Sequence, residues 1–179
     1  MNDGLIPKRY AKALFKLAVE NGDQEAIYYT LRDMSGRHTA VDELKRVMGN
    51  PTIGDDEKGR LMSLAVGAKP GSSLEKFIML IIRNNRAEFL RKIALSYVDI
   101  YREKHNIAKV VVTTATQLPS ATVQPIIDLI KRLLPDMTLE LYQEIDPELI
   151  GGFTVKMKDY LLDASVRNEL MNLRLKLLS

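Results

Sequence analysis

The sequence of 179 residues contains no cysteine, no tryptophan and only two histidines. The absence of cysteine excludes disulfide frameworks, thiolate metal sites and cysteine nucleophiles. It leaves the redox compartment open, because a protein without thiols does not depend on the redox potential around it. His38 and His105 have no second histidine or carboxylate at a ligand spacing, so we expect no metal site.

Long apolar runs are also missing. The densest run, Phe77 to Ile82, has six residues, whereas a membrane-spanning helix needs about 20. The segment from Val110 to Ile127 carries no charge, but its four threonines and two prolines make it a poor lipid span. The N-terminus lacks the charged start and apolar run of an export signal. We therefore expect a soluble protein, or one that is peripheral to a larger assembly.

The net charge of +3 is small and unevenly distributed. Residues 1–106 carry 18 basic and 14 acidic side chains, and residues 107–179 carry 8 and 9. The excess of basic over acidic residues in the first part of the chain is too small to indicate nucleic-acid binding by itself. With 46% hydrophobic residues, the chain is long enough to bury a core in one large domain or two small ones.

Six short helical segments are predicted before residue 106. In the first, Tyr10, Leu14, Leu17 and Ala18 have helical spacing, and Asn21-Gly22 is a stop signal. The apolar positions of the next five are Ile27, Leu31 and Met34; Val41, Leu44 and either Val47 or Met48; Leu61, Leu64 and Ala65; Leu74, Phe77, Ile78, Ile81 and Ile82; and Phe89, Leu90, Ile93, Tyr97, Ile100 and Tyr101. The loops between them are short, which is typical of a compact bundle of antiparallel helices.

Polar residues mark the starts of three of these segments. Asp23 is placed to cap the second helix, and the acidic run 55–57 lies in the first turn of the fourth. Ser72 to Glu75 has the pattern of a capping box that opens the fifth helix. The fifth helix has the broadest apolar face, so we expect it to be the most buried of the bundle.

The periodicity changes near Asn106. Strands are predicted at 107–114, 137–145 and 153–158, with a helix capped by Thr122 between the first two and a last helix capped by Asp163. A right-handed crossover would join the first two strands, and a hairpin would add the third. A sheet this small needs both helices on it. The predicted fold is mainly α with a small α/β part, comprising an N-terminal six-helix bundle (1–105) and a C-terminal α/β domain (106–179) without a flexible linker.

No constellation of residues indicates catalysis. Gly151-Gly152 lacks the lysine and following helix of a phosphate loop, so a bulge or close backbone packing is favoured. Asp146 precedes a proline in a turn and Asp163 is a helix cap, while Asp159 has no such local role. Nucleophile and zinc-protease motifs are absent. We expect a protein that is not an enzyme and has no cofactor.

Two features favour contact with a partner instead. Lys8, Lys12 and Lys16 recur every four residues, either as a solvated helix face or as a surface for an acidic partner or nucleic acid. The nucleic-acid alternative has no stacking platform, since Tyr10 and Phe15 do not form one with the lysines. The last helix has seven large apolar side chains in thirteen residues, which either pack in the core or form a partner surface.

Motifs along the chain resemble those of the ATP synthase delta subunit family, which includes the mitochondrial oligomycin-sensitivity-conferring protein. Residues 9–15, of sequence Arg-Tyr-Ala-Lys-Ala-Leu-Phe, resemble its opening helix. Asn50-Pro51 and the segment from Phe77 to Arg86 resemble the end of its third helix and its fifth helix. The segments 146–153 and 163–173 resemble its D-P-x-L-I-G-G turn and its final helix. The order and spacing of these motifs extend the resemblance over the whole chain.

The resemblance implies a non-catalytic subunit of the peripheral stalk, which keeps the catalytic head of the proton-translocating ATP synthase from turning with the rotor. It implies a six-helix N-terminal domain that binds the N-terminal helix of an alpha subunit, and a C-terminal domain that joins the b-subunit stalk. One copy per complex is expected, at the cytoplasmic face of a bacterial inner membrane, with membrane contact only through the complex.

The resemblance also suggests which residues meet each partner. Candidates for the alpha subunit lie on the first and fifth helices: Tyr10, Ala13, Leu14, Leu17, Leu74, Phe77, Ile78 and Ile81. Candidates for the b subunit lie in the C-terminal domain: Gly151, Gly152, Leu170, Leu173 and Leu177.

Overall fold

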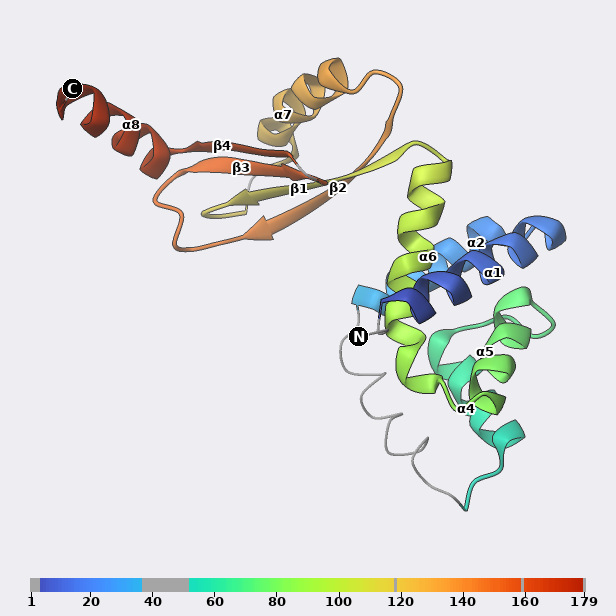
Figure 1. Cartoon of the computed structure of the whole chain (residues 1–179). Coiled ribbons are helices and arrows are strands. Elements are labelled where there is room, and N and C mark those ends of the chain that lie inside the picture. Colours follow the sequence, from blue (N-terminus) through green and yellow to red (C-terminus); the bar gives the residue numbers. More distant parts are fainter. Residues whose placement is uncertain (1–3, 37–51, 118, 159, 179) are drawn as a thin grey trace. The chain divides into compact units, whose positions relative to one another are not determined.

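The computed structural model describes residues 4–36, 52–117, 119–158 and 160–178 (Figure 1). The chain divides into two compact units, Met1–Lys104 and His105–Ser179. The first unit is helical and the second contains the sheet, so the predicted fold class, mainly α with a small α/β part, is confirmed. The predicted third helix around Val41, Leu44 and Val47 lies outside the described residues, as do His38 and Asp159.

The helices of the first unit end at the signals that the sequence carries. They are α1 (Leu5–Asn21), α2 (Gln24–Gly36), α4 (Asp55–Val66), α5 (Ser73–Arg83) and α6 (Leu90–Lys104), with a 3-10 turn at Ala87–Phe89 before α6. Gly22 ends α1 in the left-handed conformation, with φ of 71°. Such a backbone conformation costs glycine little, which is why Asn21-Gly22 stops the helix.

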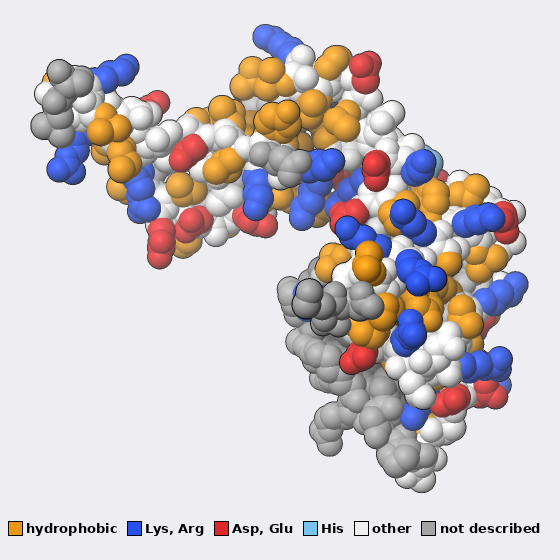
Figure 2. All heavy atoms as spheres, viewed as in Figure 1, with side chains coloured by type: hydrophobic (Ala, Val, Ile, Leu, Met, Phe, Trp, Pro, Cys, Tyr) orange, Lys and Arg blue, Asp and Glu red, His pale blue; other side chains and the backbone are white. Residues whose placement is uncertain are grey.

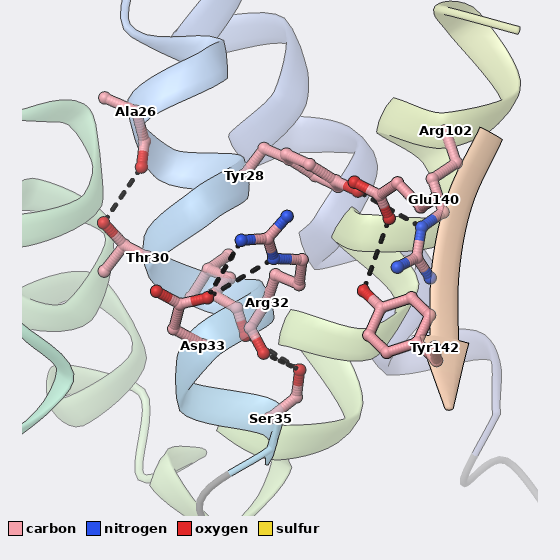
Figure 3. A network of polar contacts seen from close by, with 10 residues as sticks. Ala26, Tyr28, Thr30, Arg32, Asp33, Ser35, Arg102, Glu140 and Tyr142 are labelled. Carbon is pink, nitrogen blue, oxygen red and sulfur yellow. Dashed lines mark hydrogen bonds and ion pairs between the residues drawn. The ribbon is translucent and has the colours of Figure 1, made fainter. Parts of the chain in front are cut away.

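Helix α6 packs against α1 and α2 to form the core of this unit. Tyr28 of α2 stacks on Tyr101 of α6 with ring centroids 4.1 Å apart. The hydroxyl of Tyr28 accepts a hydrogen bond of 3.2 Å from Nε of Arg102, and Figure 3 shows this contact. The side chains that are almost fully enclosed include Leu14, Leu31, Ile78, Ile81, Ile93 and Tyr97.

The buried face of α4 differs from the prediction. Leu61 and Leu64 are 39% and 78% exposed, and Ala65 is also exposed. The buried positions are instead Gly59, Met62, Ser63 and Val66. The physical reason is that α4 packs against α5 at Gly59, where a Cβ would lie 1.9 Å from Sδ of Met79. The glycine lets the two helices approach, and it turns the leucines outward.

The second unit contains one strand more than predicted. Its elements are β1 (Ile107–Thr114), α7 (Ser120–Leu133), β2 (Thr138–Ile145), β3 (Gly152–Met157), β4 (Tyr160–Ser165) and α8 (Val166–Leu178). The strand order is β2-β1-β3-β4. β1 and β2 are parallel, as the crossover predicted, and β3 is antiparallel to both β1 and β4.

The prediction that the third strand forms a hairpin with the second is wrong, because β3 pairs with β1. The link after β2 passes the end of β1, where the N–H of Asp146 donates to the carbonyl of Thr114 at 2.9 Å. β1 carries Val110 and Val112, which are 0% and 1% exposed. A strand with these residues is best buried between two neighbours, and the hairpin would have left it at an edge.

Two predicted helix caps are also wrong. Helix α7 begins at Ser120, so Thr122 lies inside the helix and Pro119 precedes it. Asp163 belongs to β4, and the cap of α8 is Ser165, whose Oγ accepts from the N–H of Asn168 at 3.3 Å. Asp163 instead accepts from the N–H of Ser165 at 2.9 Å. Short side chains at such positions bond the backbone two residues on as readily as they cap a helix.

Only α7 covers the sheet within the described part of the unit. Its Ile126 and Ile130 pack with Val110, Val112 and Val155 in the core. Helix α8 continues directly from β4 and extends beyond the end of the sheet (Figure 1). The expectation that both helices pack on the sheet is therefore wrong. No residue separates β4 from α8, so the chain has no loop with which to turn the helix back.

Helix α8 consequently exposes its apolar side chains, and Figure 2 shows them at the surface. Leu170 and Leu173 are each 55% exposed and Leu177 is 86% exposed. The exposed surface continues along β4, where Tyr160 and Leu161 are 75% and 68% exposed. None of the described helices is long and apolar enough to cross a membrane.

Candidate partner-binding surfaces

Helix α1 carries two apolar stripes side by side. One runs through Pro7, Ala11, Leu14 and Ala18, all of which are buried in the unit. The other is shifted by one residue and runs through Ile6, Tyr10, Ala13 and Leu17, which are only partly buried or exposed. Both stripes have the spacing of four, three and four residues that places side chains on one helix face. The predicted face combined members of both stripes.

The start of α5 is tied to the turn between α1 and α2. The N–H of Ser73 donates to Oδ2 of Asp23 at 2.9 Å, and Nδ2 of Asn21 donates to Oγ of Ser73 at 2.8 Å. Asp23 precedes α2 as predicted, but its carboxylate serves the N-terminus of α5 and not that of α2. The capping box is present, with the N–H of Glu75 donating to Oγ of Ser72 at 3.3 Å. The two bonds from the N–H groups of Ser73 and Glu75 satisfy backbone donors that a helix start leaves unpaired.

Tyr97 of α6 lies beneath this junction. Its hydroxyl donates to the carbonyl of Gln24 at 3.0 Å, and its side chain is fully enclosed. Burial raises the pKa of the Tyr97 phenol, and the nearby negative charge of Asp23 adds to the effect. Both causes disfavour the phenolate, so the phenol remains a donor across the neutral range. This bond connects α6 to the start of α2, beside the bonds that join the start of α5 to Asn21 and Asp23.

Tyr10 joins the other end of α5 to α1. Its ring meets that of Phe77 edge-on, with centroids 6.1 Å apart. Its hydroxyl accepts from Nδ2 of Asn84 at 3.3 Å, and the guanidinium of Arg86 lies 5.5 Å from its ring centroid. With both ends of α5 attached to α1, the two helices border an open groove.

The groove has a volume of about 460 Å³. It is lined by Ile6, Arg9, Tyr10, Ala13 and Leu17 of α1, by Phe77 and Leu80 of α5, and by Arg86. From Ile6 to Leu17 it follows α1 for about 16 Å, or three helical turns. Leu80 is 50% exposed within it. An open apolar groove of this length between two helices fits the apolar face of a third helix.

The structure divides the eight residues predicted to meet the alpha subunit into two sets. Tyr10, Ala13, Leu17 and Phe77 line the groove. Leu14, Leu74, Ile78 and Ile81 are 1–2% exposed and belong to the core. Four lining residues were missed: Ile6, Arg9, Leu80 and Arg86. The shifted stripe on α1 is the signal that could have identified Ile6.

The lysines at positions 8, 12 and 16 are exposed on the side of α1 away from its buried stripe. Neither aromatic residue near them turns toward this face: Tyr10 lines the groove, and Phe15 lies 5.8 Å from Tyr97 between ring centroids. The described residues therefore present no aromatic platform beside the lysines for stacking nucleic-acid bases.

In the second unit, the glycine pair lies against the start of α8. The N–H of Val166 donates to the carbonyl of Gly151 at 3.1 Å. Gly152 has φ of 78°, and a Cβ there would lie 2.2 Å from the carbonyl oxygen of Ala164. This is the close backbone packing that the sequence indicated. The structure thus brings Gly151 and Gly152 next to the helix that carries the exposed Leu170, Leu173 and Leu177.

Side chains suited to metal binding do not gather among the described residues, which contain no group of three or more His, Asp or Glu that could hold an ion. The features that stand out are two apolar surfaces, one on each unit. The groove between α1 and α5 is the first, and the exposed length of α8 is the second.

The sequence matches the family model of the ATP synthase delta (OSCP) subunit over residues 6–177. A relative from Phocaeicola vulgatus, named ATP synthase subunit delta, is 31% identical over 175 residues, covering 96% of this chain and 92% of the relative. A relative of the same name from Microcystis aeruginosa is 31% identical over 172 residues, covering 96% and 94%. A chain of the Toxoplasma gondii mitochondrial ATP synthase hexamer is similar in fold, with a TM-score of 0.65, 20% identity and 97% coverage of both chains.

Proposed function

Because the chain belongs to the ATP synthase delta (OSCP) subunit family, we propose that it is the non-catalytic peripheral-stalk subunit of a proton-translocating F-type ATP synthase. It links the catalytic head to the membrane-anchored b-subunit stalk, so that rotor torque is coupled to ATP synthesis. The family match over residues 6–177 carries this proposal. Each complex contains one copy of the subunit, which lies at the cytoplasmic face of a bacterial inner membrane and needs no cofactor.

The two surfaces suit a connector of this kind. A stator resists torque through interfaces that remain bound, and apolar surfaces between helices supply them. The groove between α1 and α5 receives the N-terminal helix of the alpha subunit, with Tyr10, Ala13, Leu17 and Phe77 as its contacts. Leu14, Leu74, Ile78 and Ile81 support the groove from the core.

The b-subunit stalk binds along α8 in the second unit. Leu170, Leu173 and Leu177 follow one another at spacings of three and four residues and are at least 55% exposed. This is the pattern of a helix that packs lengthwise against another helix. Gly151 and Gly152 border its first turn. We further propose that residues 1–105 and 106–179 are separate domains, one for each partner.

A substitution that fills the groove tests the proposed contact with the alpha subunit. Ala13→Trp places a large side chain in the groove, and Ala65→Trp makes the same change on the exposed face of α4. The probe is a synthetic peptide of the first 25 or so residues of the alpha subunit from the same organism, titrated calorimetrically into the full chain. We expect Ala13→Trp to cost more than about 2 kcal/mol of binding free energy, as blocking an interface centre does.

Ala65→Trp should bind the peptide as the unaltered chain does, which controls for surface changes in general. Equal weakening by both variants would place the peptide elsewhere. Absence of saturable binding by the folded, unaltered chain would overturn the proposed contact with the alpha subunit.

The stalk contact is tested with the soluble part of the b subunit. Leu173→Asp puts a charge on the exposed face of α8, and Leu95→Asp does so on α6, where Leu95 is 46% exposed. We expect co-sedimentation with the b fragment to be lost for Leu173→Asp and kept for Leu95→Asp. The opposite result would remove α8 from the interface. Co-purification of the chain with the other synthase subunits from membranes tests the assembly as a whole.

A further inference from the structure

The charged residues that line the groove are all of one sign. Among the eight lining residues only Arg9 and Arg86 are charged, and no carboxylate is present. Neither arginine side chain has a carboxylate partner within the described residues. The guanidinium of Arg86 lies over the ring of Tyr10 at 5.5 Å, which holds it at the edge of the groove. Such stacking leaves its N–H donors available for another group.

The helices that border the groove extend this positive charge. On α1, Arg9 lies between two surfaces of the helix. One is the stripe from Ile6 to Leu17 that lines the groove, and the other is the face that carries Lys8, Lys12 and Lys16. The only carboxylate of α1, Glu20, lies in its last turn, beyond Leu17. On α5 the only carboxylate is already used, because Oε2 of Glu75 accepts from the N–H of Gly71 at 2.6 Å.

A helix that covers the groove removes water from both guanidinium groups. An arginine that loses its water without gaining an acceptor opposes binding. A carboxylate at the edge of the occupant's apolar face supplies that acceptor in a charge-assisted, two-pronged hydrogen bond.

We propose that the occupant of the groove is an amphipathic helix that carries carboxylates beside its apolar face, and that Arg9 and Arg86 pair with them. This inference rests on the proposed function, in which the occupant is the N-terminal helix of the alpha subunit. It adds the chemistry of that helix, and it makes the two arginines determinants of partner specificity.

The test uses the full chain and two synthetic peptides of the alpha-subunit N-terminus. One has the natural sequence, and in the other every Asp and Glu is replaced by Asn or Gln. We expect the amide peptide to bind the unaltered chain more weakly, because an amide oxygen accepts a weaker hydrogen bond from a guanidinium than a carboxylate does. The expected loss of affinity is about tenfold, which corresponds to 1.4 kcal/mol of binding free energy. This comparison leaves the protein untouched, so it is independent of any effect of substitutions on folding.

Substitutions in the protein test whether Arg9 and Arg86 cause the difference in affinity between the two peptides. Arg9→Gln with Arg86→Gln should weaken the natural peptide about tenfold and the amide peptide less than about twofold, which is the coupling expected of paired groups. Lys8→Gln removes one charge from α1 outside the groove and should leave both affinities within about twofold, because exposed charges contribute little. The affinity of the natural peptide should fall with salt, and that of the amide peptide should fall less.

Each outcome has a distinct meaning. If the two peptides bind equally, or if the arginine variant weakens both to the same extent, the carboxylate pairing is wrong although the groove still binds the alpha subunit. If Lys8→Gln acts as strongly as the arginine changes, the attraction is a general effect of charge and the pairing is also wrong. If neither peptide binds the folded chain, the proposed contact itself fails.

Discussion

Gly152 is the position at which one added methyl group should damage the second unit most. Its φ of 78° lies in the left-handed region, and an added Cβ would lie 2.2 Å from the carbonyl oxygen of Ala164 and 2.9 Å from Cα of Ser165. Both neighbours are backbone atoms, so no side-chain rotation can make room. The methyl group must separate the start of β3 from the end of β4, where Gly152 pairs with Ser165.

The size of the effect follows from two contributions. A left-handed conformation costs an alanine about 1–2 kcal/mol more than a glycine. The two strands must move apart to relieve the collision, and this breaks backbone hydrogen bonds between β3 and β4, each of which contributes about 1 kcal/mol to stability. Gly152→Ala should therefore lower the free energy of unfolding of the second unit by about 3–4 kcal/mol, a large part of the 5–15 kcal/mol typical of a domain.

Gly151→Ala is the matched control. Gly151 is the adjacent residue and has no positive φ, and a Cβ there would meet only the side chain of Val166, with Cγ2 nearest at 3.2 Å. A shift of a few tenths of an ångström in that side chain relieves the contact. Gly152→Asn separates the two contributions, because asparagine tolerates the left-handed region but keeps the colliding Cβ. It should remain clearly less stable than Gly151→Ala.

Hydrogen-exchange mass spectrometry measures the effect strand by strand. We expect peptides from β1, β3 and β4 to exchange more than about 100-fold faster in Gly152→Ala, and less than about tenfold faster in Gly151→Ala, since 1.4 kcal/mol is a factor of ten. Peptides from α5 serve as the reference in the first unit. Equal exchange in the two variants would refute the argument that the backbone of β4 closes on Gly152.

Three further predictions concern other residues. Leu173→Gln should change the free energy of unfolding by less than about 0.5 kcal/mol in urea titrations, because the side chain is 55% exposed; a loss above about 2 kcal/mol would mean that α8 packs on the sheet. Hydrogen bonds from the hydroxyl and N–H of Ser165 lower the pKa of Asp163, so the stability it provides is present above the unfolded-state pKa and is lost as pH falls through the folded one. An NMR titration of Asp163 should show the lowered pKa, and Asp163→Asn should reduce the loss of stability at acid pH; an ordinary pKa would contradict this. Tyr97→Phe should cost about 1 kcal/mol through the lost bond to Gln24. Because the folded-state pKa of Tyr97 is raised, stability should fall as pH rises above about 10, and the phenylalanine variant should lose less of it; an unchanged alkaline profile would contradict this.

Local signals in the sequence were enough to predict most helices of the first unit. The stop at Asn21-Gly22 and the cap at Ser72 depend on residues a few positions apart, so they act wherever the helix lies. The change of period near Asn106 likewise separated helical from strand-rich sequence. The parallel pairing of β1 and β2 followed from the length of the crossover between them.

The candidate groove was only partly predictable. The two stripes of α1 have the same spacing, so the sequence cannot tell that Leu14 lies in the core while Tyr10 and Leu17 border an open groove. That difference depends on where α5 lies, and the contacts of Asp23 and Asn84 that place α5 join residues 50 and 74 positions apart. The same holds for α4, where close packing at Gly59 decides which face is buried.

By itself the sequence determined most of the helices, the strands β1, β2 and β3, the change of period near residue 106, the absence of cysteine chemistry and the motifs of the delta subunit family. Those properties depend on residue identity and on neighbours along the chain. Only the tertiary structure placed β3 beside β1, added β4, left α8 without cover and gathered Arg9 and Arg86 at one groove. These features arise from contacts between distant segments, which helical and strand periodicity do not encode.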